Sequence, residues 1–119
     1  MEARIIIKNT LVGKLWKRLA RRKNYSGVEV IESVNELPKN LGARIFLVSR
    51  GGILRWAIMA CPCKCGDSIN ANLMESHSPC WQVKWRGNKI SIKPSLWVSE
   101  DKCGSHFWIK SNHVYWVDN

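Results

Sequence analysis

Residues 81–93 read Trp-Gln-Val-Lys-Trp-Arg-Gly-Asn-Lys-Ile-Ser-Ile-Lys, with apolar and polar side chains alternating on both sides of a Gly-Asn pair. A period of two places the apolar side chains of the first arm on one face of a strand. Gly87-Asn88 is typical of a tight hairpin turn, which sets Ile90 and Ile92 against that face. The stretch therefore predicts an antiparallel hairpin.

Similar short segments recur along the chain, separated by turn residues. The last of these turns, Ser111-Asn112, is expected to join the two strands of a second hairpin. Phe107 and Ile109 then lie on the face opposite His106. Strands this short and closely spaced favour an antiparallel sheet. We expect strands at residues 5–7, 28–33, 44–49, 53–60, 68–73, 81–86, 89–93, 106–110 and 113–117.

The N-terminal segment has a different pattern. From Thr10 to Lys23, leucines recur at helical spacing, and the opposite face is almost entirely Lys and Arg. Residues 1–23 contain eight basic side chains and one acidic side chain. The pattern predicts a basic amphipathic helix, which either packs on the domain by its leucine stripe or contacts an acidic partner, nucleic acid or an anionic membrane.

Four of the five cysteines fall into two clusters. Cys61, Cys63 and Cys65 are spaced by two, and Cys103 stands three residues before His106. Such ligands can converge on one tetrahedral Zn²⁺ ion, with Cys103 as the natural fourth sulfur and His106 as the competing ligand. A shell of thiolates leaves no position for water, so the expected zinc is structural. The alternative is a set of reduced thiols that merely pack.

The expected fold is therefore α+β: a small, mainly antiparallel, zinc-stabilised β domain with one N-terminal basic amphipathic helix. We expect the basic arm and helix to occupy residues 1–27 and the zinc-binding β domain to occupy residues 28–119. The fifth cysteine, Cys80, is expected to be a core thiol. An odd number of closely spaced cysteines fits a reducing, cytoplasmic compartment, and no apolar run approaches the roughly 20 residues that a transmembrane helix needs.

A serine and a histidine form the second candidate site. Neighbours in a strand point to opposite faces, so Ser105 is a poor hydrogen-bond partner for His106. Ser95, on an adjacent segment, can meet His106 across the sheet within the distance that a nucleophile and its base require. The alternative is an ordinary hydrogen-bonded pair. Nothing in the sequence discriminates among the acids that could orient the histidine: Asp67, Glu100 and Asp101.

These motifs together resemble a bacterial family associated with ubiquitin-like conjugation, the BubE-type peptidases. The similarity covers roughly residues 28–117, and its motifs are Cys-x-Cys-x-Cys-Gly at 61–66, Ser-x-x-Pro-Ser at 91–95, Cys-x-Ser-His-Phe-Trp-Ile at 103–109 and Val-x-Trp at 114–116. The chain departs from the family pattern at Lys64, where glycine is usual, and at Met59, where a histidine is often found.

The resemblance implies a serine-type hydrolase that trims or removes a ubiquitin-like protein by acting at its C-terminal tail. It implies Ser95, Ser105 and His106 as catalytic candidates and the four clustered cysteines, Cys61, Cys63, Cys65 and Cys103, as zinc ligands. In that mechanism Ser95 attacks, His106 takes its proton, and backbone amides near Gly104 hold the oxyanion.

The alternative function is a non-catalytic, zinc-stabilised module that binds nucleic acid or an acidic protein. The charge distribution bears on this choice. Residues 24–119 contain eleven basic and eight acidic side chains, so most of the net charge of +10 lies in the N-terminal arm. A nucleic-acid surface should continue across the body of the protein, so the hydrolase hypothesis is favoured.

Overall fold

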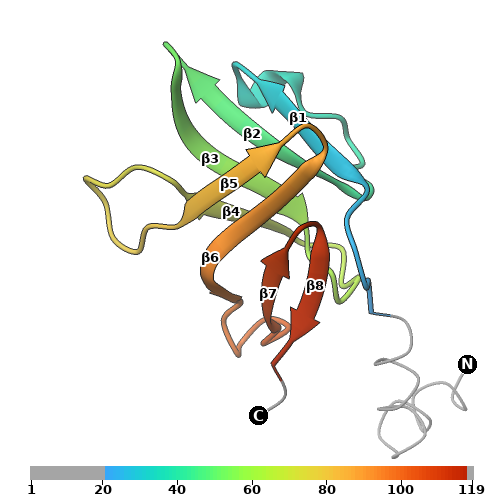
Figure 1. The fold of residues 1–119 in the computed structure, drawn as a ribbon. Helices are drawn as coiled ribbons and strands as arrows, with labels where there is room; N and C mark the ends of the chain where they lie inside the picture. Colours follow the sequence, from blue (N-terminus) through green and yellow to red (C-terminus); the bar gives the residue numbers. More distant parts are fainter. Residues whose placement is uncertain (1–20, 118–119) are drawn as a thin grey trace, which may run out of the picture.

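The computed structural model describes residues 21–117, which form two four-stranded sheets with strand orders β1-β2-β3-β4 and β5-β6-β7-β8. Figure 1 shows the second sheet lying in front of the first. The strands are β1 Gly27–Ile31, β2 Arg44–Arg50, β3 Ile53–Ala60, β4 Ser68–Asn72, β5 Gln82–Arg86, β6 Lys89–Trp97, β7 His106–Lys110 and β8 His113–Trp116.

The described part of the chain is all-β, apart from a single turn of 3₁₀ helix, η1 Val34–Glu36. The β part of the α+β prediction is therefore confirmed. The strand at residues 5–7 and residues 10–20 of the expected helix lie outside the described residues, and Arg21 to Lys23 are not helical. None of the described residues belongs to a helix that could cross a membrane.

The strand predicted at residues 28–33 is too long at its C-terminal end, since β1 ends at Ile31. Ser33 instead caps η1, where its Oγ accepts a hydrogen bond from Asn35 N at 3.1 Å. The Glu36 carboxylate completes a capping box by accepting hydrogen bonds from Ser33 N at 2.9 Å and Glu32 N at 2.8 Å. This exchange of hydrogen bonds diverts the backbone from the strand, because a capping box satisfies the free amides at the start of a helical turn.

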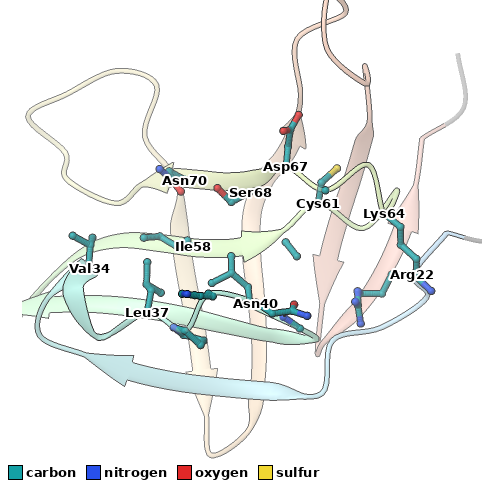
Figure 2. Close-up of a pocket in the computed structure, with 16 residues that line it drawn as sticks. Arg22, Val34, Leu37, Asn40, Ile58, Cys61, Lys64, Asp67, Ser68 and Asn70 are labelled. Atoms are coloured by element: carbon teal, nitrogen blue, oxygen red, sulfur yellow. The ribbon is translucent and has the colours of Figure 1, made fainter.

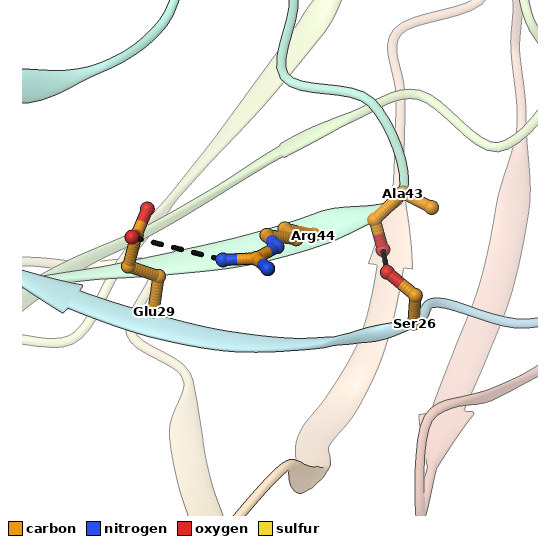
Figure 3. Close-up of polar contacts among 4 residues, drawn as sticks. All are labelled: Ser26, Glu29, Ala43 and Arg44. Carbon is orange, nitrogen blue, oxygen red and sulfur yellow. Dashed lines mark hydrogen bonds and ion pairs between the residues drawn. The ribbon is translucent and has the colours of Figure 1, made fainter.

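Strand β1 pairs with β2 in parallel, and the other five strand pairs are antiparallel. The parallel pair begins where Ser26 N and Ser26 Oγ both donate to Ala43 O, at 2.7 and 3.3 Å. Figure 3 shows the Ser26 side chain at this point and an ion pair between Glu29 and Arg44, 3.7 Å apart. Both charged side chains are about half exposed, so the backbone ladder stabilises the pair more than the ion pair does.

The two sheets share one apolar core. Its fully buried side chains come from both sheets and include Ile45, Leu47, Met59, Ile90, Ile92, Leu96, Phe107 and Ile109. Strand β2 is buried on both faces, as its continuous apolar run predicts. Phe46 and Val48 on its other face pack with Leu37 and Leu41 of the segment that follows β1.

Strand β6 continues past the end predicted at Lys93 and reaches Trp97. Ile92 pairs with Ile109 and Leu96 with Phe107, so four steps along β6 match two steps along β7. The extra residues form a bulge around Pro94. Proline supplies no amide hydrogen for a ladder, and bulges are where a strand accepts it. The bulge places Ser95 next to β7.

Asn112 ties the two hairpins of the second sheet together. Its φ of 72° lies in the left-handed region, which asparagine tolerates and the turn requires. The buried side chain accepts a hydrogen bond from Ile90 N at 2.8 Å and donates one to Asn88 O at 2.6 Å. Its carbonyl accepts from Tyr25 N at 2.8 Å, so the entering chain joins the same junction.

Candidate functional site

The turn between β3 and β4 gathers three cysteines. Cys61 N donates to Asp67 O at 2.9 Å, and Lys64 N donates to Cys61 O at 3.0 Å, so the chain doubles back within a few residues. Lys64 has a φ of 66°, in the region that favours glycine, which explains why glycine suits this position. The turn draws together sulfur atoms that an extended strand would hold apart.

The fourth sulfur comes from the loop between β6 and β7, which is closed by hydrogen bonds from Lys102 N and Gly104 N to Ser99 O at 3.0 and 3.1 Å. The Sγ atoms of Cys61, Cys63, Cys65 and Cys103 all lie within 4.8 Å of one another. Cys61 Sγ is 3.3 Å from Cys63 Sγ and 3.6 Å from Cys103 Sγ. Ligands about 2.3 Å from a tetrahedral zinc ion are about 3.8 Å apart, so this cluster could hold such a metal.

The environments of the thiols differ. Burial raises the pKa of Cys61 well above its ordinary value. Burial also acts to raise the pKa of Cys103, but hydrogen bonds from the side chain and backbone of Ser105 outweigh it and lower the value to about 7. Cys103 therefore presents a thiolate to a metal ion more readily near neutral pH than Cys61 does.

Ser105 is part of this cluster. The hydroxyl of this buried serine lies 3.2 Å from Cys103 Sγ and 3.8 Å from Cys61 Sγ. His106, the next residue, does not belong to the cluster, and its ring meets Ser95 and Trp97 instead. The alternation expected for adjacent strand residues is confirmed: Ser105 turns toward the thiols, and His106 turns away from them.

The structure brings the other two candidate residues together. Ser95 Oγ lies 2.8 Å from His106 Nε2, within hydrogen-bond distance. Trp97 pairs with His106 across β6 and β7, and its ring stacks on the imidazole with 4.3 Å between centroids and 6° between planes. The backbone of Ser95 is held separately, because the Trp81 indole Nε1 donates to Ser95 O at 3.2 Å. A tryptophan thus holds each member of the pair: Trp97 holds the His106 ring, and Trp81 holds the Ser95 backbone.

No acid orients the histidine in the described part of the chain. His106 Nδ1 is buried and has no hydrogen-bond partner there. Of the three acids considered from the sequence, Asp101 accepts a hydrogen bond from Ser99 Oγ, and this hydroxyl lowers the pKa of Asp101. The stacked Trp97 ring is therefore the contact that limits the rotation of the imidazole.

The structure differs from the expected oxyanion site at Gly104, whose amide donates to Ser99 O at 3.1 Å. This amide already stabilises the loop that carries the fourth cysteine, so it is not free to receive a developing negative charge.

A cavity of about 840 Å³ lies on the other side of the first sheet, away from the serine–histidine pair. Figure 2 shows Arg22 and Lys64 near one end of it and Val34 and Leu37 near the other. Neither Ser95 nor His106 lines this cavity, so it is not the place where that pair would meet a substrate.

The sequence pattern does not reveal two residues that contact the serine–histidine pair: Trp97, which stacks on His106, and Trp81, which donates to Ser95 O. The tryptophans are conspicuous in the composition, but pairing Trp97 with His106 requires the register after the bulge. The alternation of faces along β6 cannot be continued from Lys93 past Pro94 to find the partner of His106. The bulge adds residues to β6 and none to β7.

The fold and these two groups of residues define a class: a small two-sheet β protein that combines a four-cysteine cluster with a serine–histidine pair on the outer face of one sheet. A family model described as the bacterial ubiquitination-like system serine protease (BubE) matches residues 33–117. The chain belongs to this family, and the resemblance seen in the sequence is confirmed. No curated protein and no solved structure matches the chain.

Proposed function

We propose that this chain is a serine protease that cleaves after the C-terminal tail of a bacterial ubiquitin-like protein, with Ser95 as nucleophile and His106 as its base. The observation that carries the proposal is the 2.8 Å contact between Ser95 Oγ and His106 Nε2. The family description supports the reaction class and the biological system.

The chemistry follows from this pair. Ser95 Oγ attacks the scissile carbonyl while His106 Nε2 takes the hydroxyl proton, and His106 then gives that proton to the leaving amine. Water attacks the resulting acyl-enzyme, with His106 again as base, and releases the tail as a free carboxylate. The imidazolium that forms in each step lies against the Trp97 ring, whose face attracts a cation.

The tail has a place to lie along β6. Strand β5 begins at Gln82, opposite Lys93, so no strand of the described chain pairs with that side of β6 from Pro94 to Trp97. An extended peptide can add to such an edge through the main-chain groups that remain open beside Pro94, which has no amide hydrogen, and Ser95, whose carbonyl accepts from the Trp81 indole. A scissile bond carried there would lie beside Ser95.

The four cysteines would hold zinc in this proposal, and the ion would act as a structural support. Cys103 and His106 are joined by only two residues, so holding the Cys103 loop against the β3–β4 turn also holds the start of β7. No open coordination position remains for a water or substrate when four thiolates are bound.

The proposed function is tested with the ubiquitin-like protein of the same system, fused through its C-terminus to a fluorescent reporter. The wild-type chain should release the reporter, and mass spectrometry should find a single cut after the last residue of the tail. Intact fusion after prolonged incubation with folded, zinc-loaded chain would contradict the proposal.

Removing the stacked ring should slow turnover without removing the pair itself. Trp97→Ala should lower kcat about 10- to 30-fold, because the imidazole loses the contact that orients it and favours its charged form. Trp97→Phe should restore most of the lost kcat, and KM should change less than kcat in both variants. Steady-state kinetics with the reporter fusion measures both constants.

The matched control for this substitution is Trp85→Ala. Trp85 is also an exposed tryptophan of the second sheet, but it pairs with the buried Ile90 and so lies on the face of the sheet opposite His106. Its replacement should leave kcat within about twofold of wild type. Equal losses of kcat in Trp97→Ala and Trp85→Ala would mean that the stack has no part in catalysis.

A further inference from the structure

The charge of the β domain is concentrated on one surface. The strands of the second sheet contain no carboxylate, and their basic side chains are all exposed: Lys84, Arg86, Lys89, Lys93 and Lys110. By contrast, the strands of the first sheet mix Glu29 with three basic residues. None of the five cations of the second sheet forms an ion pair within the described chain.

The strand register places all five cations on the same side of the sheet. Ile90, Ile92 and Ile109 are buried in the core, so their strand neighbours Lys89, Lys93 and Lys110 point outward. Arg86 pairs directly with Lys89, and Lys84 pairs with Ser91. Like charges opposite each other disfavour a sheet, so this arrangement is one that an acidic partner would relieve.

The serine–histidine pair lies on this same surface. Trp97 stacks on His106 and is 57% exposed, so the pair and its ring face outward with the cations. We call this surface, from Lys84 and Arg86 on β5 to Tyr115 on β8, the outer face of the second sheet. Tyr115 is 51% exposed, and tyrosine, tryptophan and arginine are the residues that dominate protein–protein contacts.

Nucleic acid also binds basic sheets, but three rings of this surface already have one face in contact with another side chain. The Trp97 ring is covered on one side by His106. Lys110 Nζ lies over the Trp108 and Tyr115 rings, at 5.5 and 5.7 Å from their centroids. Single-stranded nucleic acid needs open ring faces as platforms, whereas a protein needs only complementary charge and shape.

We propose that the outer face of the second sheet is the docking surface for an acidic face of the ubiquitin-like substrate protein. The five cations orient that protein so that its tail reaches Ser95 at the same surface. This inference rests on the proposed function for its partner and adds where, and by which charges, the folded part of the substrate is held.

The test measures binding separately from cleavage. In a Ser95→Ala background, a triple charge reversal (Lys84→Glu, Arg86→Glu, Lys89→Glu) is titrated against the labelled ubiquitin-like protein by fluorescence anisotropy. The matched control reverses three exposed cations outside this face: Lys39→Glu, Arg44→Glu and Arg50→Glu. At low salt, the face triple should weaken binding roughly 10- to 100-fold, and the control should weaken it less than about threefold.

Two further measurements keep the test decisive if the face triple folds poorly. The milder Lys84→Gln, Arg86→Gln, Lys89→Gln variant should lose part of the affinity, and wild-type binding should weaken steeply between about 0.05 and 0.5 M salt. Equal losses in the face and control triples, or no loss in the face triple, would overturn the docking surface. So would tighter binding of a single-stranded oligonucleotide than of the ubiquitin-like protein at about 0.15 M salt.

Failure of this inference and failure of the proposed function give different results. Cleavage of the reporter fusion with unchanged affinity in the face triple overturns the docking surface alone. Binding that is lost only in the face triple, together with no cleavage by the wild-type chain, overturns the protease function alone.

Discussion

Replacing Ser95 with alanine should lower kcat for the reporter fusion at least about a thousandfold, because the reaction loses its nucleophile. The sheets should remain intact. Ser95 is half-buried and loses one side-chain hydrogen bond, so the free energy of unfolding should fall by about 1 kcal/mol or less. Steady-state kinetics and chemical denaturation measure the two effects independently.

Ser105→Ala is the matched control, since Ser105 is the other candidate serine and directly precedes His106 in the sequence. Its hydroxyl contacts the Cys103 and Cys61 sulfurs rather than the imidazole. The substitution should therefore keep kcat within a few-fold of wild type while weakening the cysteine cluster. Loss of turnover in Ser105→Ala, with turnover kept in Ser95→Ala, would reverse the assignment of the nucleophile.

Loss of the metal should unfold the domain. The wild-type chain should bind one zinc ion, and Cys61→Ser should release it, because Cys61 is buried at the centre of the sulfur cluster. Structural zinc contributes about 10–16 kcal/mol of binding free energy, comparable with the whole stability of a small domain. Losing even about 4 kcal/mol of it should lower Tm by roughly 15–30 °C.

Cys80→Ser is the control for the metal prediction. Cys80 is a half-buried free cysteine that lies outside the cluster, with its sulfur 3.6 Å from Trp81 O. This variant should keep its zinc and a Tm within a few degrees of wild type, as measured by metal analysis and calorimetry. An unchanged Tm after a chelator has removed the metal from the wild-type chain would show that the cluster does not support the fold.

The regular strands of this fold can be predicted from the sequence because their alternation reports burial directly. Strand β3 and strand β7 begin and end where the pattern places them, and Phe107 and Ile109 share one face, as expected, which is the face in the core. The partition into two sheets and the parallel pairing of β1 with β2 cannot be read in this way. These features depend on which strands meet in space, and a period of two does not encode that choice.

The sequence likewise predicts one candidate site more fully than the other. The cysteine spacing predicts the cluster, because closely spaced cysteines on two turns are typical of a site for a soft metal ion. The approach of Ser95 to His106 is also expected, but its actual geometry depends on the bulge at Pro94, which the sequence does not announce. For the same reason Trp97 is missed as a contact of His106, and none of the acids considered from the sequence bonds to its Nδ1 in the described part of the chain.

The most direct test of the serine–histidine assignment is covalent labelling of the folded, zinc-loaded chain with a fluorophosphonate, followed by peptide mass spectrometry. We expect one adduct, on Ser95, which disappears in His106→Ala although that variant still holds its zinc. An adduct on Ser105, or release of zinc from His106→Ala, would contradict the separation of the reactive pair from the metal cluster.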